Sequence, residues 1–527
     1  MILKNSIYKL TFAAMISMMA MNAGEASAQG KASKTHTETF PVVAAQKGDK
    51  AFTLEDLNFG GNNYRNMVAK NRWCTWWGDE LVRQDIDACY LVNKTTGKET
   101  KLFGIDQINQ WIAPTKDIKV RALYNAQFPF AGKSIVMVSN GSKLFTIDFK
   151  KHKLISEMEY AEGESLLEAN AQQNAFAYLK GSNLYVRTFD VANYNAMTKD
   201  KKSHDFQIST DGSREIVYGQ SVHRDEFGIS KGTFWSPNGE KLAFYRMDQS
   251  MVTDYPQVDI PEIGFDHPET QSCIATPAPD KYPMAGETSH KVTVGVFDCL
   301  TGKTIYLKAG DPTDRYFTNI AWSPDGKTIY MFELNRDQND CRLTAYSAET
   351  GEKTGELYRE TDEKYVEPCH PIQFLPWDSS SFIMQSRKDG YNHLYLCTLG
   401  KHGSRMASNT ESLEIKQLTS GKWEVMDVLG FNAKTKSIII ASNECSPIQR
   451  NIFSVDTKTG KRKMIDDCGK GWHNATLSQN GEYIYDNYST PTLPRKIAIV
   501  NTANGKRTAY FTAENPWKGY NVPEYSC

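Results

Sequence analysis

Two short phrases recur along this chain, and their repetition restricts its fold more than any other feature. The first phrase is an aromatic or apolar residue, a Ser-Pro-Asp-Gly type of turn and a short alternating strand. Clear copies lie at 234–244, 321–331 and 476–485, and weaker copies at 128–137, 374–384 and 431–440. Turn residues followed by period-two alternation of apolar residues are typical of short antiparallel strands.

The second phrase is a strand, a hairpin turn containing Gly and usually Lys, and a return strand. It occurs at 90–103, 296–307, 346–354, 453–464 and 499–508. Glycine at such a turn supplies the positive φ that a tight hairpin needs. The Trp, Ser-Pro and Asn/Asp-Gly residues of both phrases are therefore expected to serve blade packing and turn geometry.

One copy of each phrase gives about four strands per 40–50 residues, which is the period of a β-propeller blade. We count eight such units, near 65–110, 121–160, 168–210, 227–310, 315–360, 369–418, 425–466 and 473–511. The sequence therefore predicts an all-β chain that forms an eight-bladed β-propeller over residues 61–515. The fourth unit is too long, because an insertion rich in proline and acidic residues lies between Met247 and His290. We expect an extended arm there, of the kind that often serves function or contacts a partner.

The first 28 residues resemble a secretory signal, with Lys4 and Lys9 before an apolar run and small residues at 26–28. The predicted mature chain starts at Gln29, and residues 29–60 form an N-terminal extension. We expect a secreted protein, periplasmic or extracellular, with no later membrane span. Without residues 1–28 the chain has 59 basic and 61 acidic side chains. That balance provides no positive field for nucleic acid or for an anionic membrane.

The sequence contains only weak matches to known catalytic motifs. Ser230 lies in a G-x-S-x-G match, but the match runs into a strand, whereas a nucleophilic serine needs a strand–turn–helix context. His204-Asp205 and the pair His223 and Asp225 lack a serine on such an elbow. Nucleotide-binding fingerprints, metal-ligand spacings and CxxC pairs are missing from the sequence, so we expect no cofactor and no metal. The ten cysteines are scattered, and their pairing stays open.

The acidic loop before the fourth unit is the strongest candidate site. Glu226 follows Arg224 and Asp225 and lies outside the repeat pattern. One interpretation is a solvated loop charge. The other is a carboxylate that anchors the positive end of a substrate, because a charge-assisted hydrogen bond to an ammonium group contributes about 1.5–3 kcal/mol. Arg224 and Asp225 would then support the loop.

Several longer phrases closely resemble the propeller of the dipeptidyl peptidase IV family of serine peptidases, and within it the bacterial prolyl tripeptidyl peptidases. These phrases lie at 219–237, 242–252, 282–286, 289–295, 335–339, 365–371, 385–395 and 444–450. The resemblance implies an eight-bladed propeller followed by an α/β-hydrolase domain. It also implies that Glu226 binds the free N-terminus of a peptide substrate. Dipeptidyl members carry two adjacent glutamates in this region, whereas this chain has Gly219-Gln-Ser, a departure that favours the tripeptidyl type.

The family's hydrolase domain would follow residues 514–524, and this sequence ends at Cys527. We therefore expect residues 516–527 to be a truncated linker, and the chain alone to lack a catalytic triad and to be inactive. Three interpretations stay open: the substrate-gating propeller of a peptidase whose hydrolase domain is supplied by another chain, a non-catalytic exported propeller that binds peptides or a protein, and a remnant without selected function. A homodimer that forms through the arm is a further open alternative.

Overall fold

The computed structural model describes residues 42–112, 119–141, 143–159, 161–189, 203–260, 274–400 and 413–526. The chain forms two compact units, one of Ala69–Glu514 and one of Met1–Val68 with Asn515–Cys527. The expected signal peptide at 1–28 lies outside the described residues. Helices long and apolar enough to cross a membrane are absent from the described part.

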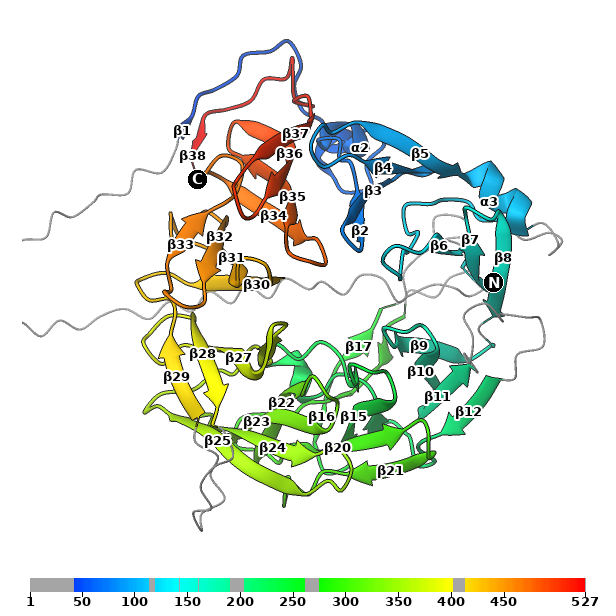
Figure 1. The fold of residues 1–527 in the computed structure, drawn as a ribbon, viewed down its shortest axis with the longest axis vertical. Helices are drawn as coiled ribbons and strands as arrows, with labels where there is room; N and C mark the ends of the chain where they lie inside the picture. The colour runs from blue at the N-terminus through cyan, green and yellow to red at the C-terminus, as the bar shows by residue number, and fades with distance from the viewer. Residues whose placement is uncertain are drawn as a thin grey trace, which may run out of the picture. The chain divides into compact units, whose positions relative to one another are not determined.

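The larger unit is an eight-bladed β-propeller, as the repeats predicted. Eight antiparallel sheets follow one another around a ring in chain order (Figure 1). Blade 1 comprises β2 (Cys74–Trp77), β3 (Glu80–Gln84), β4 (Ala88–Val92) and β5 (Glu99–Gly104); blade 2 comprises β6 (Ile135–Ser139), β7 (Lys143–Asp148) and β8 (Lys153–Glu159); blade 3 comprises β9 (Glu164–Ala169), β10 (Ala175–Lys180), β11 (Asn183–Phe189) and β12 (Ser203–Gln207); blade 4 comprises β13 (Ile216–Tyr218), β14 (Thr233–Trp235), β15 (Lys241–Asp248), β20 (Lys291–Asp298) and β21 (Lys303–Tyr306).

The second half of the ring repeats the four-stranded pattern. Blade 5 comprises β22 (Arg315–Trp322), β23 (Thr328–Asn335), β24 (Asp340–Ser347) and β25 (Lys353–Thr361); blade 6 comprises β26 (Gln373–Leu375), β27 (Asp378–Ser386), β28 (His393–Leu399) and β29 (Leu413–Gln417); blade 7 comprises β30 (Val425–Asn432), β31 (Ser437–Ser442), β32 (Asn451–Asp456) and β33 (Arg462–Met464); blade 8 comprises β34 (Trp472–Leu477), β35 (Tyr483–Thr490), β36 (Leu493–Asn501) and β37 (Arg507–Thr512). Helix α3 (Ile105–Ile112) connects blades 1 and 2 and buries Ile108 and Ile112.

The recurring Ser-Pro-Asp-Gly turns are fixed by side-chain hydrogen bonds. In blade 5 the Ser323 hydroxyl accepts from the amide of Thr328 at 2.9 Å and donates to Asp325 at 2.6 Å. Gly326 takes a φ of 69°, which is the left-handed region that favours glycine. Ser236 plays the same role in blade 4, accepting from the amide of Lys241 at 2.9 Å.

In blades 4 and 5, the tryptophan of the first phrase joins its blade to the blade before it. Trp235 of blade 4 donates its indole N–H to the carbonyl of Glu168 in blade 3 at 3.4 Å. Trp322 of blade 5 donates in the same way to Phe234 in blade 4 at 3.0 Å. The structure thus confirms the packing role predicted for these residues.

Blade 4 departs from the predicted pattern. We expected the Glu226 loop to join the third and fourth units, but β13 lies before that loop and pairs with the far end of β15, with Ile216 opposite Asp248. β14 pairs with the same strand, with Thr233 opposite Phe244. The loop 219–232 is therefore an insertion within the innermost edge of blade 4. A three-residue strand is too short for its sequence pattern to reveal it.

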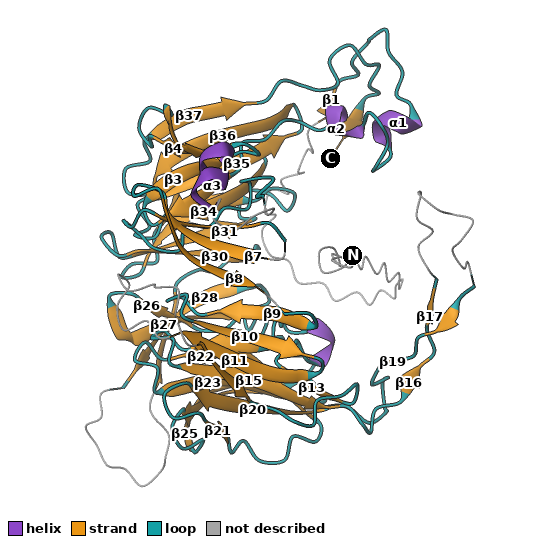
Figure 2. Cartoon of the chain, turned by 90° about the vertical axis from the view of Figure 1, so that its right-hand side faces the viewer, coloured by secondary structure: helices purple, strands orange, loops and turns teal. Residues whose placement is uncertain are grey.

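The insertion in blade 4 forms the expected arm, which extends from the propeller between β15 and β20 (Figure 2). It is a ladder of two short pairs, β16 (Asp254–Tyr255) with β19 (Asp280–Lys281) and β17 (Val258–Asp259) with β18 (Thr276–Pro277). Arg214 ties the base of the arm, donating to Asp254 at 2.6 Å and to the carbonyl of Pro279 at 2.7 Å.

The ring closes between blades 8 and 1 through side chains and loops. Among the described residues, no strand is shared by the two sheets. Instead, buried Leu81 and Val92 of blade 1 pack in one cluster with Tyr485, Ile497 and Ile499 of blade 8. At the rim of this seam the Trp76 indole donates to the Thr476 hydroxyl at 3.0 Å, and the Tyr510 hydroxyl donates to Glu99 at 2.6 Å.

The smaller unit brings the first and the last described segments together. β1 (Val42–Val43) pairs with β38 (Tyr525–Ser526), and two single-turn helices, α1 (Leu54–Leu57) and α2 (Tyr64–Met67), lie between β1 and the propeller in sequence. Phe52 stacks on Tyr520 with ring centroids 4.7 Å apart, and the Trp517 indole donates to the carbonyl of Met67 at 3.1 Å. The segments that we expected to be an N-terminal extension and a C-terminal linker thus pack together.

Candidate functional site

A polar cavity of about 690 Å³ lies on the propeller at blades 4 and 5. Three stretches line it: the loop inserted in blade 4, the return limb of the arm, and one edge of blade 5, where β22 begins and β23 ends. The lining residues are His223, Arg224, Glu226, Tyr282, Pro283, Ala285, Gly286, Glu287, Ser289, His290, Asp314, Tyr316, Asn335, Arg336, Asp337 and Gln338. A volume of this size is within the usual range for small-molecule sites.

The backbone of the loop that carries Glu226 is unusual. His223, Arg224, Asp225 and Phe227 all have positive φ, between 52° and 63°. This conformation costs a non-glycine residue roughly 1–2 kcal/mol. Runs of such residues persist only where the surroundings determine them, and they concentrate at functional sites. The strain supports the loop as a functional element independently of its charge.

We predicted that Arg224 and Asp225 support the loop. Arg224 lies in the cavity wall, whereas Asp225 lies outside the cavity. The Arg224 guanidinium forms an ion pair with Asp280 of the arm and lies over the Tyr282 ring, 5.0 Å from its centroid. Arg224 therefore connects the loop to the arm and forms part of the cavity wall. Asp225 is exposed and is not among the residues that line the cavity.

Glu226 lies in the cavity wall and is exposed to it. Its main chain is held, because its amide donates to the carbonyl of His223 at 3.2 Å and its carbonyl accepts from Ile229 at 3.1 Å. Its carboxylate forms no hydrogen bond or ion pair with any residue that the structure describes. A fixed backbone with a free carboxylate is the arrangement needed to receive a cationic group from a ligand.

The same cavity also contains a positively charged side chain, that of Arg336. Arg336 donates to the Ser289 hydroxyl at 2.7 Å and to the Tyr316 hydroxyl at 2.8 Å, and it has no ion pair within the described ranges. His223 and His290 lie nearby with ring centroids 6.4 Å apart. Burial, and then the positive charges of the surrounding groups, lower the pKa of His223 to about 3 and that of His290 to about 4. Both rings are therefore neutral at physiological pH.

The His223 ring is held by the main chain of β22. Its Nε2 accepts from the amide of Phe317 at 3.4 Å, so the proton of the neutral ring is on Nδ1. This Nδ1–H is buried and has no acceptor among the described residues. The Tyr316 ring lies against His223 at 4.9 Å, edge to face.

The weaker sequence candidates are not assembled into a catalytic site. Ser230 lies in a loop that runs into β14, so it lacks the strand–turn–helix context. Asp205 accepts from Arg187 at 2.7 Å in blade 3. Sequence analysis missed Tyr282, Ser289 and Arg336, although each belongs to a phrase that carried the family resemblance. A stretch on the arm and a loop of blade 5 become neighbours only through the propeller geometry.

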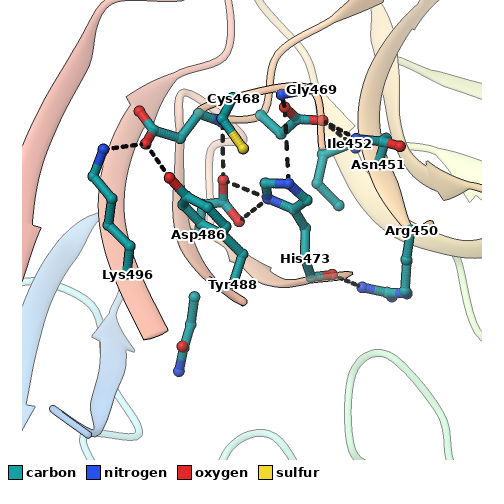
Figure 3. A network of polar contacts seen from close by, with 12 residues as sticks. Arg450, Asn451, Ile452, Cys468, Gly469, His473, Asp486, Tyr488 and Lys496 are labelled. Atoms are coloured by element: carbon teal, nitrogen blue, oxygen red, sulfur yellow. Dashed lines mark hydrogen bonds and ion pairs between the residues drawn. The ribbon is translucent and has the colours of Figure 1, made fainter. Parts of the chain in front are cut away.

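A second polar cluster lies between blades 7 and 8 (Figure 3). His473 Nδ1 donates to both carboxylate oxygens of Asp486 at 2.8 and 2.9 Å, and its Nε2 donates to the carbonyl of Lys470 at 2.9 Å. His473, Asp486 and Asp466 are fully buried, and both ring nitrogens are occupied. The cluster is therefore structural, since no ligand reaches it. The thiol of neighbouring Cys468 donates to the same carbonyl at 3.1 Å.

The fold and the cavity together define a class of protein: an eight-bladed propeller whose strained, arm-supported loop presents a free carboxylate in a polar cavity. Residues 131–495 match the model of the dipeptidyl peptidase IV N-terminal region. The chain belongs to this family.

Relatives and solved structures agree with this assignment. The chain is 42% identical to a candidate dipeptidyl aminopeptidase IV from Bacteroides ovatus ATCC 8483, with a TM-score of 0.76 over 89% of this chain and 64% of that one. Dipeptidyl peptidase 4 of Porphyromonas gingivalis shares the fold, with 19% identity and a TM-score of 0.66 over 90% of this chain and 64% of that one. A probable dipeptidyl-aminopeptidase B of Pyrenophora tritici-repentis (strain Pt-1C-BFP) is 24% identical over 88% of this chain and 52% of its own length. The chain thus spans about half the length of such curated relatives.

Proposed function

We propose that this chain is the substrate-recognising propeller of a secreted prolyl tri- or dipeptidyl serine peptidase, and that Glu226 binds the free N-terminus of the peptide. The observation that carries the proposal is the free carboxylate of Glu226 in the cavity wall. An ammonium group is the ligand that this carboxylate fits best, because it brings both a positive charge and hydrogen-bond donors. Arg336 provides donors for a peptide oxygen in the same cavity.

A fixed carboxylate acts as a ruler for the cleaved bond. Each extended residue spans about 3.3–3.6 Å, so the distance from the anchor to a nucleophile sets the number of residues removed. The proposed preference is for three residues, on the ground that the adjacent glutamates of the dipeptidyl members are replaced by Gly219-Gln-Ser.

The catalytic step itself requires an activated serine with a histidine and an acid, and the described residues do not assemble this set. We propose that a hydrolase domain with a serine nucleophile acts with this propeller, and the relatives' additional length supports this. The alternative is a propeller that binds peptides without cleaving them. Either activity would take place in the periplasm or outside the cell, which the apolar N-terminal stretch of the sequence supports.

The arm is a second surface for a partner. Its side chains Val258 and Ile260 are 60% and 71% exposed, and large exposed apolar residues on a protruding element favour protein contacts. A second copy of the chain is one such partner, and light scattering of the purified protein would detect the dimer.

The binding proposal is tested with a fluorescent peptide of the Xaa-Xaa-Pro type, prepared with a free and with an acetylated N-terminus. We expect the chain to bind the free peptide better and Glu226→Gln to lower that affinity about tenfold to a hundredfold, through loss of a charge-assisted hydrogen bond. Asp225→Asn is the matched control, because this neighbouring carboxylate lies outside the cavity. Equal binding of both peptides by the unaltered chain would contradict the proposal.

The peptidase assignment is tested on the native secreted protein by intact mass and by hydrolysis of an Xaa-Xaa-Pro chromogenic substrate. A mass well above that of residues 29–527 together with cleavage would support a complete exopeptidase. A mass equal to those residues without cleavage would favour the non-catalytic alternative.

A further inference from the structure

Within the loop that carries Glu226, the segment 223–227 is held at both ends by one strand of the neighbouring blade. At its start, the amide of Phe317 in β22 donates to the ring of His223. At its end, the side-chain amide of Asn319 in the same strand donates to the carbonyl of Phe227 at 3.0 Å. Glu226 lies between these two attachment points, directly before Phe227.

Asn319 is suited to this position by its own backbone. It has a φ of 54° and lies where the pairing of β22 with β23 shifts register, between Thr318 and Ala321. Asparagine tolerates this left-handed conformation better than most residues. The residue is 7% exposed and does not line the cavity, so it cannot touch a ligand there.

The same side chain reaches a third segment. The Asn319 amide also donates to the carbonyl of Pro368, in the connection between blades 5 and 6. That connection presses against the loop, because a Cβ on Gly228 would lie 2.1 Å from the carbonyl oxygen of Cys369. One buried amide thus joins the Glu226 loop, the bulge of β22 and the entry to blade 6.

We propose that Asn319 is a positioning residue for ligand binding at Glu226. By anchoring the carbonyl next to Glu226, it holds the loop in its left-handed conformation and the carboxylate in the cavity wall. The inference rests on the proposed function, since it assigns Asn319 a role in binding the peptide N-terminus. It adds a residue outside the cavity that determines the affinity of the site.

The test uses Asn319→Gly, since glycine keeps the left-handed backbone and removes the side-chain donors. We expect the variant to bind the free-amine Xaa-Xaa-Pro peptide about fivefold to tenfold more weakly, as for one or two lost hydrogen bonds. Binding of the acetylated peptide should not change. Asn319→Asp keeps the size, but its ionised carboxylate cannot donate and is repelled by the two carbonyls, so it should weaken binding at least as much. It is the second variant if the glycine variant does not fold.

Asn432→Gly is the matched control. Asn432 is buried as Asn319 is, and its amide bridges blades 7 and 8 by donating to Gly481 at 3.1 Å and Thr502 at 2.8 Å, away from the cavity. This variant should lose thermal stability and keep the affinity of the unaltered chain.

A double variant separates positioning from general damage. If Asn319 acts through Glu226, then Asn319→Gly should have no further effect on peptide affinity when Glu226→Gln is already present. The inference is overturned if the Asn319 variants bind as the unaltered chain does, if they weaken both peptides equally, or if the full loss persists in the Glu226→Gln background. The proposed function fails separately, if the unaltered chain does not distinguish the two peptides.

Discussion

His473 is a residue whose protonation is coupled to folding. Burial lowers the pKa of His473, but the hydrogen bond to Asp486, the charges of Asp486 and Asp466 and the contact with the Lys470 carbonyl together outweigh it, so the pKa is raised above its usual value. Other groups around it are the Tyr488 ring, stacked at 4.5 Å, and Arg450, which donates to the carbonyl of His473. The imidazolium form therefore stabilises the packing of blade 8 against blade 7.

We predict that this histidine makes the free energy of unfolding depend on pH. A folded-state pKa raised above 6.5 adds stability that is fully present below pH 6.5 and is lost as the pH rises through the folded value. Urea unfolding at several pH values from 6 to 9 should show this decline. It should be absent in His473→Gln.

The control for this prediction is His393→Gln. His393 is equally buried, but its ring nitrogens contact the Thr419 hydroxyl and the carbonyl of Gly421, and no carboxylate. Its replacement should leave the decline between pH 6 and 9 intact. A decline that persists in His473→Gln would contradict the assignment.

At the scale of elements, the arm depends on a few contacts with the body of blade 4. Arg224→Gln removes the ion pair with Asp280 and the cation–π contact with Tyr282. Partly exposed ion pairs contribute about 0.2–1 kcal/mol, so we expect trypsin to cleave after Lys281, next to Asp280 and Tyr282, a few times faster. Arg359→Gln, which breaks a comparable pair with Asp340 on blade 5, should leave that cleavage rate unchanged. Equal rates in all three proteins would show that Arg224 does not hold the arm.

A second prediction at this scale concerns the contribution to stability of the seam between blades 8 and 1. Leu81 of β3 is fully buried in the cluster that closes the ring. Leu81→Ala should lower the free energy of unfolding by about 2–5 kcal/mol, because it leaves a cavity in that cluster. Leu166→Ala on β9, where the side chain is 43% exposed, should change it by less than about 0.5 kcal/mol. Similar effects of the two changes, measured by urea unfolding, would exclude a special role for the seam.

The sequence predicts elements best where the turn chemistry is local. Ser323, Asp325 and Gly326 bond to one another within a few residues, so the blade they begin can be placed from the sequence alone. β13 and the β1–β38 pair could not be predicted, because their partners are distant and the strands are two or three residues long. Within the site, Glu226 was identified from its exceptional loop, whereas Asn319 resembles any turn residue until its partner Phe227 is known.

At the scale of the whole molecule, the described cysteines are not paired. Eight free thiols are present, at Cys74, Cys89, Cys299, Cys341, Cys369, Cys397, Cys445 and Cys468. Burial raises the pKa of Cys89 and of Cys397 to about 12, so their reactive thiolate forms are scarce.

We therefore predict that few thiols react with a thiol reagent in the native protein and that many more react after unfolding without reductant. A thiol reagent should modify the exposed Cys445 and Cys468 first, and at least eight thiols should react in denaturant. Fewer than eight after unfolding, with masses that show bridged peptides, would contradict the free state of these residues.

The closure of the ring has a consequence for how the chain folds. Each blade is built from one continuous stretch, so its contacts have short sequence separation and can form as the polypeptide emerges. The contact of Trp76 with Thr476 instead spans 400 positions and cannot form before blade 8 exists. Until then Leu81 and Val92 lack their partners, and the growing chain exposes an apolar edge. The slowest step should therefore be the docking of the last blade on the first, and assembly intermediates should be open arcs that chaperones can recognise.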